Sequence, residues 1–225
     1  MALLQNPPMA AKPRASEGSE GRVQRRKART RVALLAAARQ LFAASGVDRT
    51  TIAEIAERAD IATGSFYNYF DTKDELLEAL LEEELAKQLT LLELRQAQVD
   101  DPAEKISVAH RHLVRVAQTD PDWGWLFVRL EFPDRVVWSV MGDPAARDLA
   151  DGVRAGRFAV ANQRLALAAS GGALFAVIHE QLAGEASPKA DIEHAEGVLR
   201  SLGLDRADAA AIAARPLPEA KEPPA

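Results

Sequence analysis

The sequence predicts an all-α protein, and both its composition and the spacing of its apolar residues support that class. Ala and Leu dominate, whereas aromatic residues make up only 5% of the chain. Ala and Leu favour helices, while aromatic and β-branched residues favour strands. Apolar residues also recur at three- and four-residue spacing, which is typical of amphipathic helices. We expect an N-terminal unit of three helices followed by a larger helical unit.

The first helix is expected from about Arg26 to Ala44. Before it, residues 1–21 contain Pro, Ala, Gly and Ser without periodic apolar residues, which predicts a flexible tail. Ser45-Gly46 should end the helix, because Gly adopts the left-handed C-terminal conformation without strain. The apolar face of this helix consists of Leu34, Leu35, Ala38, Leu41 and Phe42.

A basic run covers the start of this helix. Six basic residues and no acidic residue occur between Arg22 and Arg31. The run has two interpretations: a solvated helix start, or a basic arm that lies along DNA phosphates or enters a minor groove. The charge of the whole chain is −5, but residues 1–73 carry +5 and residues 74–225 carry −10. The basic half is therefore the expected contact for a polyanion.

Two short helices separated by a tight turn are predicted next. Thr51 can cap the first helix, and Glu54 completes a capping box. The pattern breaks at residues 59–62 and restarts as a helix over residues 63–70. Helices this short need a third helix to pack against, which is the helix-turn-helix arrangement. Asp60 stands where such turns often use Gly, and Asp tolerates the left-handed backbone better than most residues.

At this point the sequence resembles the tetracycline-repressor (TetR) family. The resemblance covers about residues 28 to 80 and is carried by Thr50-Thr51-Ile52, Ile55-Ala56, Ala59, Ile61, Gly64-Ser65-Phe66-Tyr67, Tyr69-Phe70 and Lys73. It implies a homodimeric regulator that binds two successive major grooves of a near-palindromic operator in double-stranded DNA. A small molecule would control this binding. The fold class implied is an N-terminal three-helix helix-turn-helix domain followed by a helical ligand-binding and dimerisation domain.

The resemblance also implies the DNA contacts. Base edges would be faced by Thr63, Gly64, Ser65 and Tyr67, and phosphates would be contacted by Thr51, Tyr67, Tyr69 and Lys73. Short hydroxyls reach base edges, and Gly64 allows the backbone to approach DNA. The two Tyr could instead pack on the surface, and Lys73 could be merely solvated. The family often has Ser or Thr where Ala62 stands and Lys or Arg where Thr63 stands, so the operator sequence does not follow.

The second unit is expected over residues 73–214. It should contain a long helix from about Lys73 to Ala97, helices over 102–119, 162–183, 188–202 and 206–214, and shorter helices between Pro121 and Pro144. Residues 215–225 are Pro-rich and are expected to be disordered. The helices over 162–183 and 188–202 match in position the family's four-helix dimer interface, although their small residues could instead pack within one subunit.

An effector pocket is predicted around the aromatic residues of this unit, but those residues could equally form plain core. All three Trp lie between residues 122 and 139. The predicted pocket residues are Trp123, Trp125, Phe127, Arg129, Trp138, Phe175 and His179. His179 could alternatively satisfy a core carbonyl. His110 and His112 point in different directions on a helix, which argues against metal binding. The expected effector is a small apolar or amphipathic molecule.

The remaining features restrict the class of protein. The chain has no Cys, which excludes disulfides, thiolate metal sites and cysteine nucleophiles. No cofactor or metal motif, signal-peptide core or uninterrupted apolar run of membrane-spanning length is evident, so we expect a cytoplasmic protein without a membrane segment. A helical adaptor that uses its helix-turn-helix for protein contacts, or an enzyme, are the alternatives to a regulator.

Overall fold

The computed structural model describes residues 17–129 and 137–221 of the 225-residue chain. Within those residues every regular element is a helix, as the composition predicts. The elements in chain order are α1 (Glu17–Ser45), α2 (Ile52–Arg58), α3 (Thr63–Phe66), α4 (Lys73–Gln96), α5 (Pro102–Thr119), α6 (Pro121–Val128), the π-helix η1 (Trp138–Gly142), α8 (Asp143–Arg154), α9 (Gln163–Ala183), α10 (Ala190–Ser201) and α11 (Arg206–Ala213).

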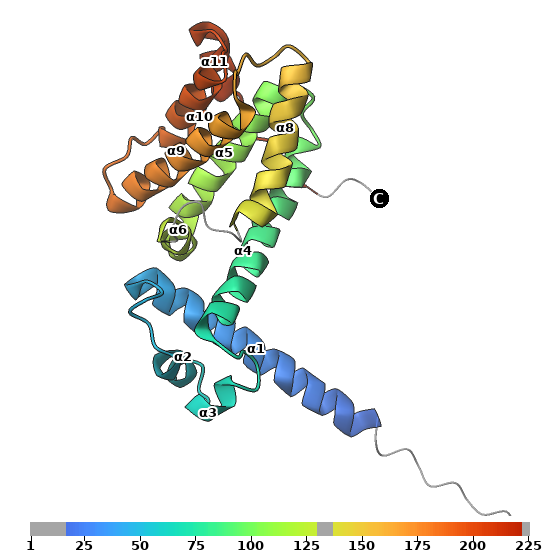
Figure 1. Cartoon of the computed structure of the whole chain (residues 1–225), viewed down its shortest axis with the longest axis vertical. Helices are drawn as coiled ribbons and strands as arrows, with labels where there is room; N and C mark the ends of the chain where they lie inside the picture. Colours follow the sequence, from blue (N-terminus) through green and yellow to red (C-terminus); the bar gives the residue numbers. More distant parts are fainter. Residues whose placement is uncertain (1–16, 130–136, 222–225) are drawn as a thin grey trace, which may run out of the picture.

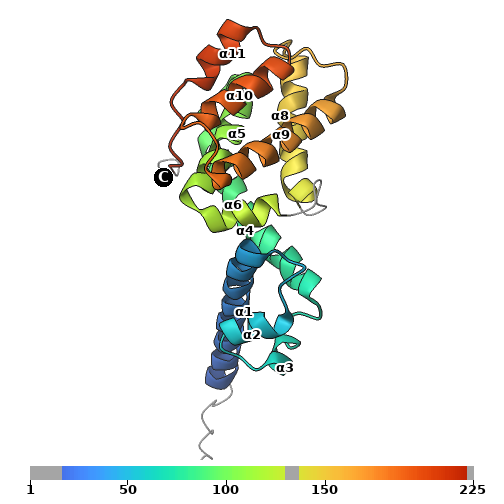
Figure 2. The same ribbon diagram turned by 90° about the vertical axis from the view of Figure 1, so that its left-hand side faces the viewer.

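The helices form two units joined by α4. Helices α1, α2 and α3 make a head at one end of the molecule, and α5, α6 and α8 to α11 make a bundle at the other (Figures 1 and 2). Helix α4 begins beside the head and continues into the bundle (Figure 1). The head is therefore connected to the bundle by a continuous helix, which can transmit movement over its length.

One hydrophobic core runs through both units. The cluster includes Leu34 and Phe42 of α1, Leu76 and Leu85 of α4, and Trp123 of α6, all of them almost completely buried. Leu174 and Ile178 of α9 belong to the same cluster. A second cluster lies between α5, α8, α10 and α11. Because the first cluster is continuous, the head and the bundle pack on each other and are not independent domains joined only by a linker.

At most helix starts, the side chain of the N-cap residue accepts a hydrogen bond from a backbone N–H group of the first turn. These side chains belong to Thr51, Thr72, Asp101, Asp120, Asn162 and Asp205. Such caps satisfy N–H groups that have no partner inside the helix. Pro102 and Pro121 follow their caps directly, where a missing N–H group costs nothing. Caps and prolines are visible in the sequence, which is why the predicted helix starts are mostly confirmed.

Helix α1 begins earlier than expected. The prediction placed its start near Arg26 and a flexible tail over residues 1–21, but the helix starts at Glu17. The segment lacks apolar periodicity, so the pattern search missed it. Its Glu, Arg and Gln residues are nevertheless good helix formers, and no Pro lies between Pro13 and the end of α1.

Two other segments also differ from the prediction. Helix α3 ends at Phe66, and the chain continues to Phe70 as a turn whose Tyr69 N–H donates to the Phe66 carbonyl at 2.9 Å. Residues 215–221, expected to be disordered, pack against α4. There Leu217 joins a small apolar cluster, and Gln98 donates to the Glu219 carbonyl at 2.8 Å. Residues 1–16, 130–136 and 222–225 lie outside the described residues.

Candidate DNA-binding surface and effector cavity

The start of α2 is held by the capping box that the sequence predicts. The Glu54 N–H donates to the Thr51 hydroxyl at 3.2 Å, and the Thr51 N–H donates to the Glu54 carboxylate at 2.7 Å. The Thr51 hydroxyl also donates to that carboxylate at 2.8 Å. Thr51 thus fixes the first turn of α2, and a phosphate contact from its hydroxyl stays a prediction.

The turn between α2 and α3 has the geometry that Asp60 was expected to supply. Asp60 has φ 56°, the left-handed conformation, and it is the one non-glycine with positive φ among the described residues. The Ile61 N–H then donates to the Ala56 carbonyl at 3.0 Å. Ala56 is completely buried, so a larger side chain would separate the two helices. Ala56 and Phe66 are therefore core residues that aim α3.

The outward side of α3 carries the residues predicted to meet DNA. Thr63 and Gly64 are exposed, Ser65 is half-buried, and Tyr67 is 56% exposed with its ring edge against Phe66. Nothing lies within 4 Å of a Cβ placed on Gly64, and its φ is not positive. The fold itself therefore gives no reason for a glycine at this position. Close approach of DNA to Gly64, which the sequence predicts, would give one, and it stays a prediction.

Tyr69 and Lys73, which were predicted to contact phosphates, both contact other parts of the head. Tyr69 is half-buried and packs on the core cluster. The Lys73 ammonium donates to the Val47 carbonyl at 2.7 Å and to the Thr50 carbonyl at 3.0 Å. Lys73 thereby holds the loop between α1 and α2, a structural role that the sequence did not suggest. With two of its three donors used, at most one remains for a phosphate.

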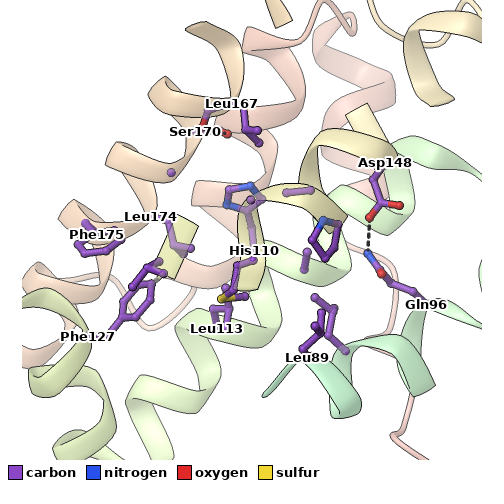
Figure 3. Close-up of a pocket in the computed structure, with 18 residues that line it drawn as sticks. Leu89, Gln96, His110, Leu113, Phe127, Asp148, Leu167, Ser170, Leu174 and Phe175 are labelled. Carbon is purple, nitrogen blue, oxygen red and sulfur yellow. Dashed lines mark hydrogen bonds between the residues drawn. The ribbon is translucent and has the colours of Figure 1, made fainter. Parts of the chain in front are cut away.

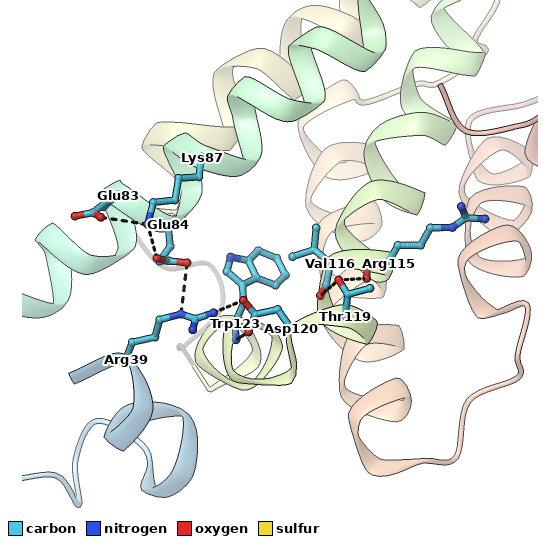
Figure 4. Close-up of polar contacts among 9 residues, drawn as sticks. All are labelled: Arg39, Glu83, Glu84, Lys87, Arg115, Val116, Thr119, Asp120 and Trp123. Atoms are coloured by element: carbon cyan, nitrogen blue, oxygen red, sulfur yellow. Dashed lines mark hydrogen bonds and ion pairs between the residues drawn. The ribbon is translucent and has the colours of Figure 1, made fainter. Parts of the chain in front are cut away.

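Helix α6 belongs to the bundle, and both of its ends are attached to α1 of the head. Asp120 caps α6 by accepting from the Trp123 N–H at 3.1 Å, and it also forms an ion pair with Arg39 of α1 (Figure 4). Arg39 lies 3.5 Å from the Glu84 carboxylate of α4. At the other end of α6, Arg129 donates to the Ala43 carbonyl in the last turn of α1. Helix α6 cannot move without disturbing α1.

A cavity of about 120 Å³ lies inside the bundle. Its walls are mostly apolar and come from α4, α5, α6, η1, α8 and α9 (Figure 3). The lining residues are Leu89, Leu92, Gln96, Ala109, His110, Leu113, Phe127, Val137, Met141, Gly142, Pro144, Ala145, Asp148, Leu167, Ser170, Gly171, Leu174 and Phe175. An engineered apolar cavity of about 150 Å³ binds benzene. The cavity is therefore of a size to hold a molecule with one ring.

Gln96 and Asp148 form the polar end of the cavity. The Gln96 amide donates to the Asp148 carboxylate at 3.1 Å and to the Lys105 carbonyl at 3.0 Å (Figure 3). Burial raises the pKa of the Asp148 carboxyl, and the Gln96 hydrogen bond opposes that shift. A carboxylate has several lone pairs, so Asp148 can accept further hydrogen bonds from a hydroxyl group that enters the cavity.

A histidine pair lies at another wall of the cavity, where His110 is itself a lining residue. His110 Nδ1 and His194 Nε2 are 2.9 Å apart and link α5 to α10. Burial lowers the pKa of His110 to about 3 and that of His194 to about 4, so both rings are neutral at pH 7. One ring nitrogen donates and the other accepts. The pair is a neutral polar contact between two helices.

The predicted effector residues fall into three groups. Phe127 and Phe175 line the cavity, with ring centroids 4.3 Å apart. Trp123 does not line it, because its ring is core, 2% exposed and stacked on Phe127. Trp125, Arg129 and His179 are also outside the lining: the Arg129 guanidinium lies over the Trp125 ring, and the Trp125 ring meets the exposed His179 edge-on. These four residues therefore do not line this cavity, and a direct contact of theirs with an effector stays a prediction. The side chain of Trp138 lies outside the described residues.

Helix α9 presents an apolar face to solvent. Among the described residues it is the one helix long and apolar enough to cross a membrane by length and composition, yet only 17% of its apolar window is buried within the subunit. Leu165 is 65% exposed, and Ala169, Ala173 and Ala176 are exposed on the same face. In Figure 2 no other helix covers α9 and α10 at the front of the bundle. The sequence predicted these two helices as the dimer interface.

Comparison with known proteins agrees with this architecture. Residues 34–80 match the model of bacterial regulatory proteins of the tetR family, and residues 101–215 match the tetracyclin repressor-like C-terminal domain. The crystal structure of RolR in complex with the ligand resorcinol is 37% identical, covers 88% of this chain and 100% of its own, and has a TM-score of 0.71. RolR without ligand is 38% identical over 84% of this chain and all of its own, with a TM-score of 0.69.

A curated relative matches over a short stretch of the chain. The HTH-type transcriptional regulator TtgR of Pseudomonas putida is 45% identical over 53 residues, which are 24% of this chain and 25% of TtgR. The match thus spans about a quarter of that relative's length. The fold and the exposed recognition surface define a DNA-binding transcriptional regulator with a helix-turn-helix head and a helical C-terminal domain. The chain belongs to the TetR family.

The role of Gly64 can be tested by adding one methyl group. We expect Gly64→Ala to keep or raise the free energy of unfolding, by up to about 1 kcal/mol, because Ala is the better helix former and the added Cβ meets no neighbour. Operator affinity should nevertheless fall by at least tenfold. Chemical denaturation and a fluorescence anisotropy titration measure the two quantities. Unchanged operator affinity would show that DNA does not approach this position.

Proposed function

We propose that the protein is a repressor that leaves its operator when a small molecule fills the cavity of the bundle. The observation that carries this proposal is that the cavity shares its walls with the supports of the head. Leu89, Leu92 and Gln96 belong to α4, which begins at the head, and Phe127 belongs to α6, which is held to α1 at both ends. A molecule in the cavity can therefore alter the head without touching DNA.

The proposed effector is an aromatic compound with one ring and one or more hydroxyl groups. The volume of the cavity and its apolar walls suit a ring, and the Asp148 carboxylate suits a hydroxyl donor. RolR, which is similar over most of the chain, was crystallised with resorcinol, a dihydroxybenzene. The chemistry of this cavity and the ligand of that relative support the same class of compound.

The effector assignment predicts a selective loss in one variant. Resorcinol should bind the purified protein in a calorimetric titration and release it from operator DNA recovered by selection with the protein. Asp148→Asn should weaken resorcinol binding roughly 10- to 100-fold, since a hydrogen bond to a charged group contributes about 1.5–3 kcal/mol. Benzene, which has no hydroxyl group, should not distinguish the variant from the parent.

Asp151→Asn is the matched control, because Asp151 lies on the same helix and is exposed. It should bind resorcinol as the parent does. If neither resorcinol nor other hydroxylated single-ring compounds bind, or if Asp148→Asn binds them unchanged, the proposed effector class is wrong.

The proposed repressor acts as a homodimer formed through α9 and α10. The exposed apolar face of α9 needs a cover, and a second copy of the same face provides one with two-fold symmetry. One helix-turn-helix contacts few base pairs, so specific affinity also requires two heads. The same pairing would set the distance between the two α3 helices.

Ala173→Glu should break the dimer, because Ala173 is exposed at the middle of the α9 face and a buried carboxylate opposite its own copy is costly. Light scattering should show the mass falling from about twice the 24.3 kDa of one chain toward that value, and operator affinity should fall at least 100-fold. Ala146→Glu, on the exposed side of α8, should leave both unchanged. A parent protein that is monomeric with and without operator would exclude the dimer.

A further inference from the structure

The first turns of α1 carry an arginine stripe that the helix-turn-helix does not use. Arg22, Arg25, Arg26 and Arg29 stand at i, i+3, i+4 and i+7 and therefore share one face of the helix. Every residue from Arg22 to Arg29 is exposed. The helix rises about 10 Å over this distance. The stripe is thus a row of cations whose spacing is set by the helix.

The stripe lies at the DNA-binding end of the molecule. In Figure 1 the first turns of α1 extend past α2 and α3, away from the bundle. The second half of α1 is anchored by the buried Leu34 and Phe42. Closer to the stripe, the Arg31 guanidinium lies 5.4 Å from the centre of the Phe70 ring and 4.0 Å from the Glu83 carboxylate. These contacts fix the direction of the projecting turns relative to α3.

The fold itself does not require such a segment. Between Arg22 and Arg31 there is no acidic residue, and the exposed turns bury no face against the head. Neighbouring cations on one helix face repel each other, which destabilises the helix. The segment also precedes residues 34–80, which match the helix-turn-helix model of the family. A polyanion that binds outside the shared helix-turn-helix would explain its charge.

We propose that the arginine stripe binds phosphates of the duplex DNA that flanks each operator half-site. The inference rests on the proposed DNA-binding function and extends the contact beyond the base pairs that α2 and α3 reach. Duplex DNA carries one negative charge per about 1.7 Å of its axis, so a 10 Å stripe meets several phosphates. The arginine fork matches phosphate oxygens in pairs. The contact adds affinity and footprint without reading sequence.

The test compares two operator duplexes and two triple variants. One duplex ends at the outer edges of the half-sites, and the other extends about 12 base pairs further on each side. The test variant is Arg25→Gln/Arg26→Gln/Arg29→Gln. The control is Arg147→Gln/Arg154→Gln/Arg206→Gln, which removes the same charge from exposed positions on the bundle. Gln retains helix propensity, and circular dichroism checks that α1 is intact.

The parent protein should bind the extended duplex more tightly than the trimmed one, with a steeper dependence of log K on log salt. The test variant should lose this difference. Its salt slope on the extended duplex should fall by about 0.9 for each phosphate contact removed, or up to about 5 for a dimer that loses three per chain. Hydroxyl-radical footprints should shorten at both ends. The control should match the parent in every measurement.

Equal salt slopes for the parent and the test variant on the extended duplex would overturn the proposal. If the parent still bound the trimmed duplex specifically in that case, the helix-turn-helix assignment would stand. Equal losses on both duplexes would also overturn it, because the stripe would then act at the half-site itself. A parent that prefers neither duplex over random DNA would contradict the proposed function, and the inference would fail with it.

Discussion

The attachment of α6 to α1 is the contact on which the rest of the structure depends. Helix α6 has only eight residues, and each of its ends is fixed to the head. Asp120 caps its first turn and pairs with Arg39, while Arg129 follows its last turn and donates to the Ala43 carbonyl. The Ala43 carbonyl lies in the last turn of α1, where helix carbonyls lack internal partners and favour a cation. Between these ends, Phe127 forms part of the cavity wall.

This geometry gives the proposed regulation a physical route. A molecule that displaces Phe127 shifts α6, and because α6 is fixed at both ends the shift reaches α1 and the packed head. Paired recognition helices must lie about 34–36 Å apart to enter successive major grooves. A change of head orientation therefore weakens DNA binding in a dimer even when no DNA contact is lost in either subunit. By linkage, the effector must bind the free dimer more tightly than the operator complex, by the factor that it lowers operator affinity.

The sequence predicted the features that depend on local signals. Thr51 with Glu54 marked α2, Asp60 marked the turn, and Pro102 marked α5, because caps and special backbone conformations act over a few residues. Features held by distant contacts were missed. Asp148 meets Gln96 across 52 positions, and His110 meets His194 across 84, so neither pair forms a pattern in the chain. Aromatic clustering identified Phe127 as a wall residue but could not separate it from Trp123, which packs behind it in the core.

The central claim is that α6 carries the state of the cavity to the head, and Arg129 tests it most directly. Resorcinol affinity is measured by calorimetry for the free protein and for its operator complex, in the parent and in Arg129→Met, which keeps an apolar stem but cannot donate to the Ala43 carbonyl. The account predicts a lower affinity in the parent's operator complex. In Arg129→Met, resorcinol should bind the free protein normally, and the ratio of the two affinities should move toward one. A variant that binds resorcinol and operator with the parent's ratio would contradict the account.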